Sequence, residues 1–171
     1  MSERIGAVTM KGKPLTLVGR EVKAGDPAPD FQVVDNNLGL FTFSSRLGQV
    51  SVISSVPSLD TPVCDLETRR FNQEAAHLGA GVNILTVSMD LPFAQKRWCG
   101  AAGVDRVQTY SDHLDAAFGL AYGVLIKELR LLARAVFVVD AAGVIRYTQL
   151  VKEMATEPDY DAVLQAVRRL A

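Results

Sequence analysis

The sequence has few cysteines and histidines and almost no net charge, and each shortage argues against a class of protein. Two cysteines and two histidines occur among its 171 residues, and no pair of them has the short spacing of zinc ligands. Two cysteines are too few for the disulfide framework of a small secreted domain. Lys and Arg number 18 against 19 Asp and Glu, so the basic surplus of a nucleic-acid-binding protein is missing.

Long apolar runs are also missing. The longest strongly apolar run, 135–139, stops at Asp140 and is too short to cross a membrane. The first ten residues have no long apolar core behind their basic residue, so we expect no signal peptide. A cytoplasmic protein is therefore expected, and in that reducing compartment a free cysteine is either a buried apolar residue or a reactive group.

The hydrophobic content and the pattern of expected strands and helices predict one folded domain over 1–171. Hydrophobic residues make up 49% of the chain, enough for a core. An N-terminal β-hairpin is expected at about 5–19. Further strands are expected at 31–34, 40–43, 50–55, 82–88, 107–110, 135–139 and 144–150, and helices at 62–77, 92–99 and from about 156 onward. This order predicts an α/β protein of thioredoxin-like fold, a central mixed sheet with helices on both faces.

Cys64 lies where a predicted buried strand is followed by a helix. Thr61 is a good N-cap residue and Pro62 suits the first helical position, so Cys64 falls in the first turn. Unpaired backbone N–H groups and the positive end of the helix dipole favour a thiolate there. From position alone, a packing role and a reactive role for Cys64 are about equally well supported.

Pro57, Thr61 and Cys64 form the pattern Pro-x-x-x-Thr-x-x-Cys, which resembles the active-site motif of peroxiredoxins. Three longer strings resemble the thiol peroxidase branch of that family, as does the N-terminal hairpin: Ser-Leu-Asp-Thr-Pro-Val-Cys (58–64), Asp-Leu-Pro-Phe-Ala-Gln (90–95) and Thr-Glu-Pro-Asp-Tyr (156–160). The resemblance covers nearly the whole chain. It implies that Cys64 is the peroxidatic cysteine, that hydrogen peroxide and organic hydroperoxides are the substrates, and that Pro57 screens Cys64 from water.

Arg134 is a charge within an apolar stretch, 131–137. It could extend to solvent at a strand edge or pair with an unrelated carboxylate. The resemblance implies instead that Arg134 lies over Cys64 and holds the thiolate and peroxide oxygens through its planar guanidinium. Thr61 would add a hydroxyl donor.

Cys99 lies at the end of the second predicted helix, beside Trp98, where a core cysteine would be equally ordinary. The resemblance implies that Cys99 is the resolving cysteine. It would condense with the sulfenic acid of Cys64 to an intrachain Cys64–Cys99 disulfide that thioredoxin reduces. A disulfide needs Cα atoms within about 7 Å, so we expect one or both helices to unwind partly in each turnover.

Other functions remain as alternatives. The absence of Cys-x-x-Cys argues against a thioredoxin-type reductase, and Gly79-Ala80-Gly81 lacks the third glycine of a nicotinamide-binding motif. A redox sensor, a holdase or a one-cysteine peroxiredoxin would use the same cysteines differently. The resemblance also implies a homodimer and no cofactor. The apolar stretch 116–132 fits a subunit contact or an interior segment equally well.

We predict that Arg134→Ala lowers peroxidase activity by orders of magnitude without unfolding the protein, because a fixed cation is needed beside the breaking O–O bond. Peroxide consumption and circular dichroism measure the two properties. Near-normal turnover in this variant would show that the role of Arg134 is assigned wrongly.

Overall fold

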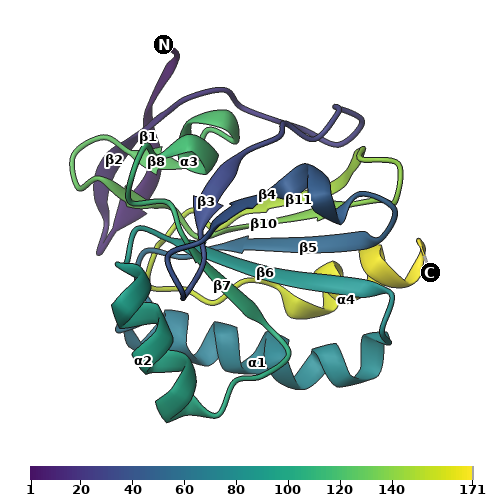
Figure 1. Cartoon of the computed structure of the whole chain (residues 1–171). Coiled ribbons are helices and arrows are strands. Elements are labelled where there is room, and N and C mark those ends of the chain that lie inside the picture. The colour runs from purple at the N-terminus through teal and green to yellow at the C-terminus, as the bar shows by residue number, and fades with distance from the viewer. Residues whose placement is uncertain (171) are drawn as a thin grey trace.

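The computed structural model describes residues 1–170, which form two β-sheets and their covering helices (Figure 1). The large sheet contains β3 (Gln32–Val34), β4 (Leu40–Thr42), β5 (Val50–Ser55), β6 (Val82–Ser88), β7 (Gln108–Ser111), β10 (Ala135–Val139) and β11 (Ile145–Leu150). The small sheet contains β1 (Glu3–Met10), β2 (Lys13–Val18), β8 (Leu125–Ile126) and β9 (Leu131–Leu132). The helices are η1 (Phe43–Arg46), α1 (Pro62–Leu78), α2 (Pro92–Ala102), α3 (Ala117–Ala121) and α4 (Tyr160–Arg168).

The large sheet is mixed, as the sequence predicts. Its strand order is β11-β10-β5-β6-β7-β3-β4. The central strands β5, β6 and β7 run parallel, and β10, β11, β3 and β4 are antiparallel to their neighbours. Every residue of β5 and of β10 is buried, which explains the continuous apolar sequence of β10, whereas β5 buries three serines among its apolar residues. The thioredoxin-like α/β prediction is confirmed.

The two faces of the large sheet are covered differently. Helices α1, α2 and α4 lie together on one face (Figure 1), where Phe71 and Val163 pack against the apolar side chains of β5, β6 and β10. The other face is covered by the small sheet and by α3, and Val8 and Phe118 belong to that core. The prediction of helices on both faces is confirmed, and the N-terminal hairpin adds strands to the second layer.

The apolar stretch 116–132 is interior except at the turn 127–130, which is exposed. It forms α3, β8 and β9, and Phe118, Tyr122 and Ile126 are fully buried in the core of their own chain. A subunit contact through these side chains is therefore excluded. The sequence did not predict α3, because a helix of five residues is too short to show a helical repeat.

The ends of α1 follow the expected signals. Pro62 occupies the first helical turn, and the helix stops at Gly79, whose φ of +86° favours glycine. Within residues 1–170, none of the helices combines the length and the apolar character that a membrane crossing requires.

Candidate functional site

The chain passes from β5 to α1 through a short loop, 56–61, which a neighbouring connection holds in place. The Val56 amide donates to the carbonyl of Val87 at 3.0 Å. Asp90, which follows β6, accepts hydrogen bonds from the Ser58 hydroxyl at 2.7 Å and from the Leu59 amide at 2.8 Å. The start of α1 is thus fixed by β6 and by the segment that leads to α2.

Thr61 is the N-cap residue of α1, as predicted, and its backbone is extended. Its hydroxyl does not cap the helix but donates to the carbonyl of Ser58 at 2.9 Å. The N–H groups of the first turn therefore donate no hydrogen bond to this side chain. Pro57 is buried in the same loop.

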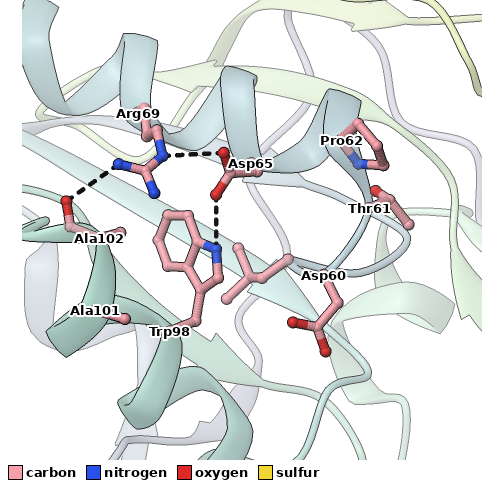
Figure 2. Close-up of a pocket in the computed structure, with 9 residues that line it drawn as sticks. Asp60, Thr61, Pro62, Asp65, Arg69, Trp98, Ala101 and Ala102 are labelled. Atoms are coloured by element: carbon pink, nitrogen blue, oxygen red, sulfur yellow. Dashed lines mark hydrogen bonds and ion pairs between the residues drawn. The ribbon is translucent and has the colours of Figure 1, made fainter.

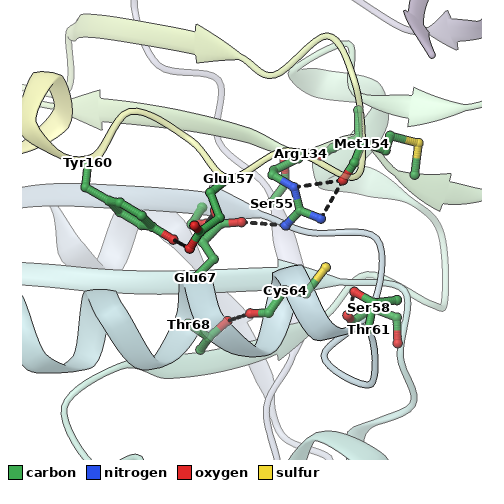
Figure 3. Close-up of polar contacts among 12 residues, drawn as sticks. Ser55, Ser58, Thr61, Cys64, Glu67, Thr68, Arg134, Met154, Glu157 and Tyr160 are labelled. Atoms are coloured by element: carbon green, nitrogen blue, oxygen red, sulfur yellow. Dashed lines mark hydrogen bonds and ion pairs between the residues drawn. The ribbon is translucent and has the colours of Figure 1, made fainter. Parts of the chain in front are cut away.

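Cys64 is completely buried, with an exposed fraction of 0%. Its side chain lies in a small cluster with Val56 and Leu59, and Trp98 packs against the same cluster. The Thr68 hydroxyl donates to the backbone carbonyl of Cys64 at 2.9 Å. Figure 3 shows the sulfur on the side of α1 that faces Arg134. Cys64 therefore points into the protein, and it is more enclosed than its sequence position indicated.

Arg134 directly precedes β10 and is buried, with an exposed fraction of 1%. Its Nη1 donates to Oε2 of Glu67 at 2.6 Å. Its Nε and Nη2 donate to the carbonyl of Met154, at 3.2 and 2.8 Å. An arginine that extends to solvent is excluded. The guanidinium does pair with a carboxylate, but one that lies a single helical turn after Cys64 (Figure 3).

Glu67 is the residue of this site that sequence reasoning missed. It is 0% exposed, and Oε1 accepts a hydrogen bond from the Ser54 hydroxyl at 2.8 Å. Burial raises the pKa of Glu67 above its usual value, while the charge of Arg134 opposes that rise. A signal was present, because position 67 shares the inward face of α1 with Cys64, and a charge on such a face needs a partner.

The charge of Arg134 is set by its neighbours. Burial works against the charged form, but attraction to Glu67 and then to Cys64 outweighs it, so the pKa of Arg134 is raised above its usual value. The guanidinium is therefore a permanent cation, and it lies on the side of α1 to which the Cys64 sulfur points (Figure 3).

Cys99 faces different partners from Cys64, and both cysteines are free thiols. Its sulfur lies 3.3 Å from the Thr109 hydroxyl and 4.0 Å from Nδ2 of Asn36. A hollow of about 400 Å³ lies beside it, with Arg46 among its lining residues. The two cysteines therefore have different neighbours: Cys64 lies among Val56 and Leu59, and Cys99 beside Thr109 and Asn36.

A cluster of contacts joins the two helices that carry these cysteines (Figure 2). Trp98 Nε1 of α2 donates to Oδ1 of Asp65 in α1 at 2.8 Å. The Arg69 side chain bonds Asp65 at 2.9 Å and the carbonyl of Ala102 at 3.2 Å, and its guanidinium lies 5.7 Å from the Trp98 ring centre. We call Asp65, Arg69 and Trp98 the interhelix clamp. Asp65 follows Cys64 in the chain, and Trp98 precedes Cys99.

Comparisons with known proteins agree with this geometry. A model of the Redoxin family matches residues 23–164. A thiol peroxidase of Bacillus subtilis (strain 168) is 55% identical over 163 residues, which cover 95% of this chain and 97% of that protein. A thiol peroxidase of Oceanobacillus iheyensis is 57% identical over 162 residues, 95% of this chain and 98% of that protein.

Solved structures are similar over almost the full length. The crystal structure of a peroxiredoxin-like protein from Aquifex aeolicus has a TM-score of 0.91 at 44% identity, covering 98% of this chain and 99% of that one. A thiol peroxidase from Chromobacterium violaceum has a TM-score of 0.85 at 21% identity, covering 95% of each chain, and supports the fold alone.

We predict that Glu67→Ala costs about 3–5 kcal/mol of unfolding free energy, because it leaves the Arg134 guanidinium buried without its carboxylate. Urea denaturation of the reduced protein measures this. Glu74→Ala is the matched control, since it breaks the half-buried pair between Arg70 and Glu74 on the same helix, a pair that remains in contact with solvent and contributes about 0–1 kcal/mol.

Equal losses in the Glu67 and Glu74 variants would contradict the buried ion pair. The same argument adds a loss of stability to the loss of activity expected of Arg134→Ala, because that variant leaves Glu67 unpaired. Arg134→Lys retains a cation beside Glu67 and is the milder substitution.

Proposed function

Because this chain belongs to the redoxin family and, within it, to the thiol peroxidases, we propose that Cys64 reduces hydroperoxides and is regenerated through a disulfide with Cys99. The observation that carries this proposal is the buried guanidinium of Arg134, which Glu67 and the Met154 carbonyl hold on the side of α1 to which the Cys64 sulfur points (Figure 3). No group other than the protein's own side chains and backbone is needed for these steps.

In the first step the Cys64 thiolate attacks one oxygen of the hydroperoxide. An S–O bond forms, the O–O bond breaks, and the sulfur is oxidised to a sulfenic acid while the peroxide is reduced to an alcohol or to water. Negative charge collects on the leaving oxygen, which accepts a proton. Arg134 is the cation that stabilises this charge, because it is fixed by Glu67 and by the carbonyl of Met154 before the peroxide arrives.

In the second step the Cys99 thiol attacks the Cys64 sulfenic acid, water leaves, and a disulfide forms. Cys99 must first give up its contact with Thr109. The interhelix clamp holds α1 and α2 together immediately beside both cysteines, so it must open as these helices unwind. A dithiol protein of the thioredoxin type then reduces the disulfide and returns both thiols. Action as a homodimer in the cytoplasm belongs to the same proposal.

A steady-state assay tests the cycle. With thioredoxin and its reductase, the protein is expected to consume hydrogen peroxide and an organic hydroperoxide continuously, and Cys64→Ser is expected to abolish this. Cys99→Ser is expected to react once and then stop with thioredoxin as the sole reductant. Peptide mapping of the oxidised protein is expected to show an intrachain 64–99 link.

Several outcomes would contradict the proposed cycle. A single turnover by the unaltered protein would indicate a redox sensor rather than a peroxidase. Full recycling in Cys99→Ser would indicate a one-cysteine peroxiredoxin. A disulfide that is chiefly intermolecular would overturn the resolving role of Cys99.

The clamp generates a separate prediction. Trp98→Phe keeps an aromatic ring but removes the N–H that donates to Asp65, and a hydrogen bond to a charged group contributes about 1.5 kcal/mol. We therefore expect disulfide formation to be roughly tenfold faster after one equivalent of peroxide. Rapid alkylation of the remaining thiols, followed by mass spectrometry, measures the rate.

Arg70→Gln is the matched control for the clamp. Arg70 pairs with Glu74 of α1 and lies 4.9 Å from the ring centre of Tyr160 in α4, so it makes the same kinds of contact from α1, but with α4 as the neighbouring helix. Its rate of disulfide formation is expected to be unchanged. A rate that is unchanged or slower in Trp98→Phe would show that the clamp does not limit the approach of the cysteines.

A further inference from the structure

Glu67 binds Nη1 of Arg134, whereas a backbone carbonyl binds its other donors. The carbonyl of Met154 accepts from both Nε and Nη2, at 3.2 and 2.8 Å. Two donors on one acceptor fix the plane of the guanidinium as well as its position. The orientation of Arg134 over Cys64 therefore depends on where the Met154 carbonyl is placed.

Met154 lies in a loop between β11 and α4, outside any regular strand or helix. The N-terminal hairpin holds this loop. The Thr9 amide donates to the carbonyl of Lys152 at 2.7 Å, and the Met154 amide donates to the carbonyl of Thr9 at 2.9 Å. The Met154 side chain is buried in the same core cluster as the hairpin residue Val8. The hairpin and the loop therefore form one packed unit.

Glu153 binds the end of the hairpin with its carboxylate. Its two oxygens accept from the Thr9 hydroxyl at 2.6 Å and from the amides of Lys11 and Gly12 at 2.9 and 3.1 Å. These hydrogen bonds, with that from Thr9 the strongest, lower the pKa of Glu153 to about 2. Glu153 is therefore ionised throughout the neutral range, where charged acceptors form stronger hydrogen bonds than neutral ones.

We propose that Glu153 is a positioning residue for the peroxide step, which binds the hairpin turn and thereby fixes the Met154 carbonyl and the guanidinium of Arg134 over Cys64. The inference rests on the proposed role of Arg134. It gives the N-terminal hairpin a part in the chemistry, although no hairpin residue hydrogen-bonds to the Arg134 side chain. Glu153 touches neither substrate nor sulfur and acts only through its neighbour.

The test compares Glu153→Gln with Glu128→Gln. Glu128 also binds the hairpin through its carboxylate, which accepts from the Thr16 amide at 3.0 and 2.9 Å, but it lies in the turn between β8 and β9 rather than in the Met154 loop. We expect single-turnover oxidation of Cys64 by hydrogen peroxide to be roughly three- to tenfold slower in Glu153→Gln, the effect of one net hydrogen bond. In Glu128→Gln it is expected to change less than twofold.

The pH profile of Cys64 alkylation by iodoacetamide separates positioning from general stability. In Glu153→Gln the profile is expected to shift to higher pH, because a displaced guanidinium favours the thiolate less. In Glu128→Gln it is expected to stay in place. If the rate of Cys64 oxidation and the pH profile of its alkylation change equally in Glu153→Gln and Glu128→Gln, the proposal is overturned, and the hairpin contributes only stability.

A double-variant cycle tests whether Glu153 acts through Arg134. In an Arg134→Lys background, Glu153→Gln is expected to change the alkylation rate less than twofold, and the same loss as in the unaltered background would overturn the proposal. The alkylation rate of Cys64 tests this coupling even if hydroperoxides are not the substrate. Failure of the peroxidase assay with an intact alkylation coupling would count against the proposed function alone.

Discussion

The site depends on one buried cation. Arg134 is 1% exposed and lies among the Glu67 carboxylate, the Met154 carbonyl and the Cys64 sulfur. Charges attract more strongly in such surroundings than in water, so the guanidinium stabilises negative charge that develops beside it. The same burial makes the arginine costly without partners. Glu67 and the loop after β11 are thus as much a part of the site as Cys64.

In the proposed cycle, the burial of Cys64 beside Arg134 opposes the resolving step, in which Cys99 attacks the sulfenic acid of Cys64. Packing that encloses Cys64 and orients Arg134 favours attack on peroxide, but it also separates Cys64 from Cys99. The interhelix clamp affects both steps, because Asp65 and Trp98 are the immediate neighbours of the two cysteines in the chain. In the proposed cycle, the stability of α1 and α2 would therefore control how long the sulfenic acid persists before Cys99 resolves it. A protein with a looser clamp would resolve faster but hold its reactive cysteine less firmly.

The sequence predicted the order of strands and helices except η1, α3, β8 and β9, and it predicted the place of Cys64 in the first helical turn and the unusual charge at Arg134. These features depend on local signals, namely apolar runs, Pro62 at a helix start and a charge among apolar neighbours. The partners of Arg134 were not predicted. Glu67 lies on a helix face that also carries polar residues, and the Met154 carbonyl is backbone, which no side-chain pattern reveals. The Thr61 hydroxyl donates to the Ser58 carbonyl rather than capping the helix, and this depends on the conformation of the loop, which the sequence does not reveal.

The most direct test of the central claim compares two reactions of the same sulfur in the unaltered protein and in Arg134→Lys. At a pH high enough to ionise Cys64 in both proteins, the rate constants with hydrogen peroxide and with iodoacetamide are measured. If the guanidinium stabilises the breaking O–O bond, the peroxide rate falls by about 100-fold or more, as for loss of a transition-state donor, while alkylation falls far less. Equal falls in both rates would show that Arg134 serves only to ionise the thiol, and would contradict the account.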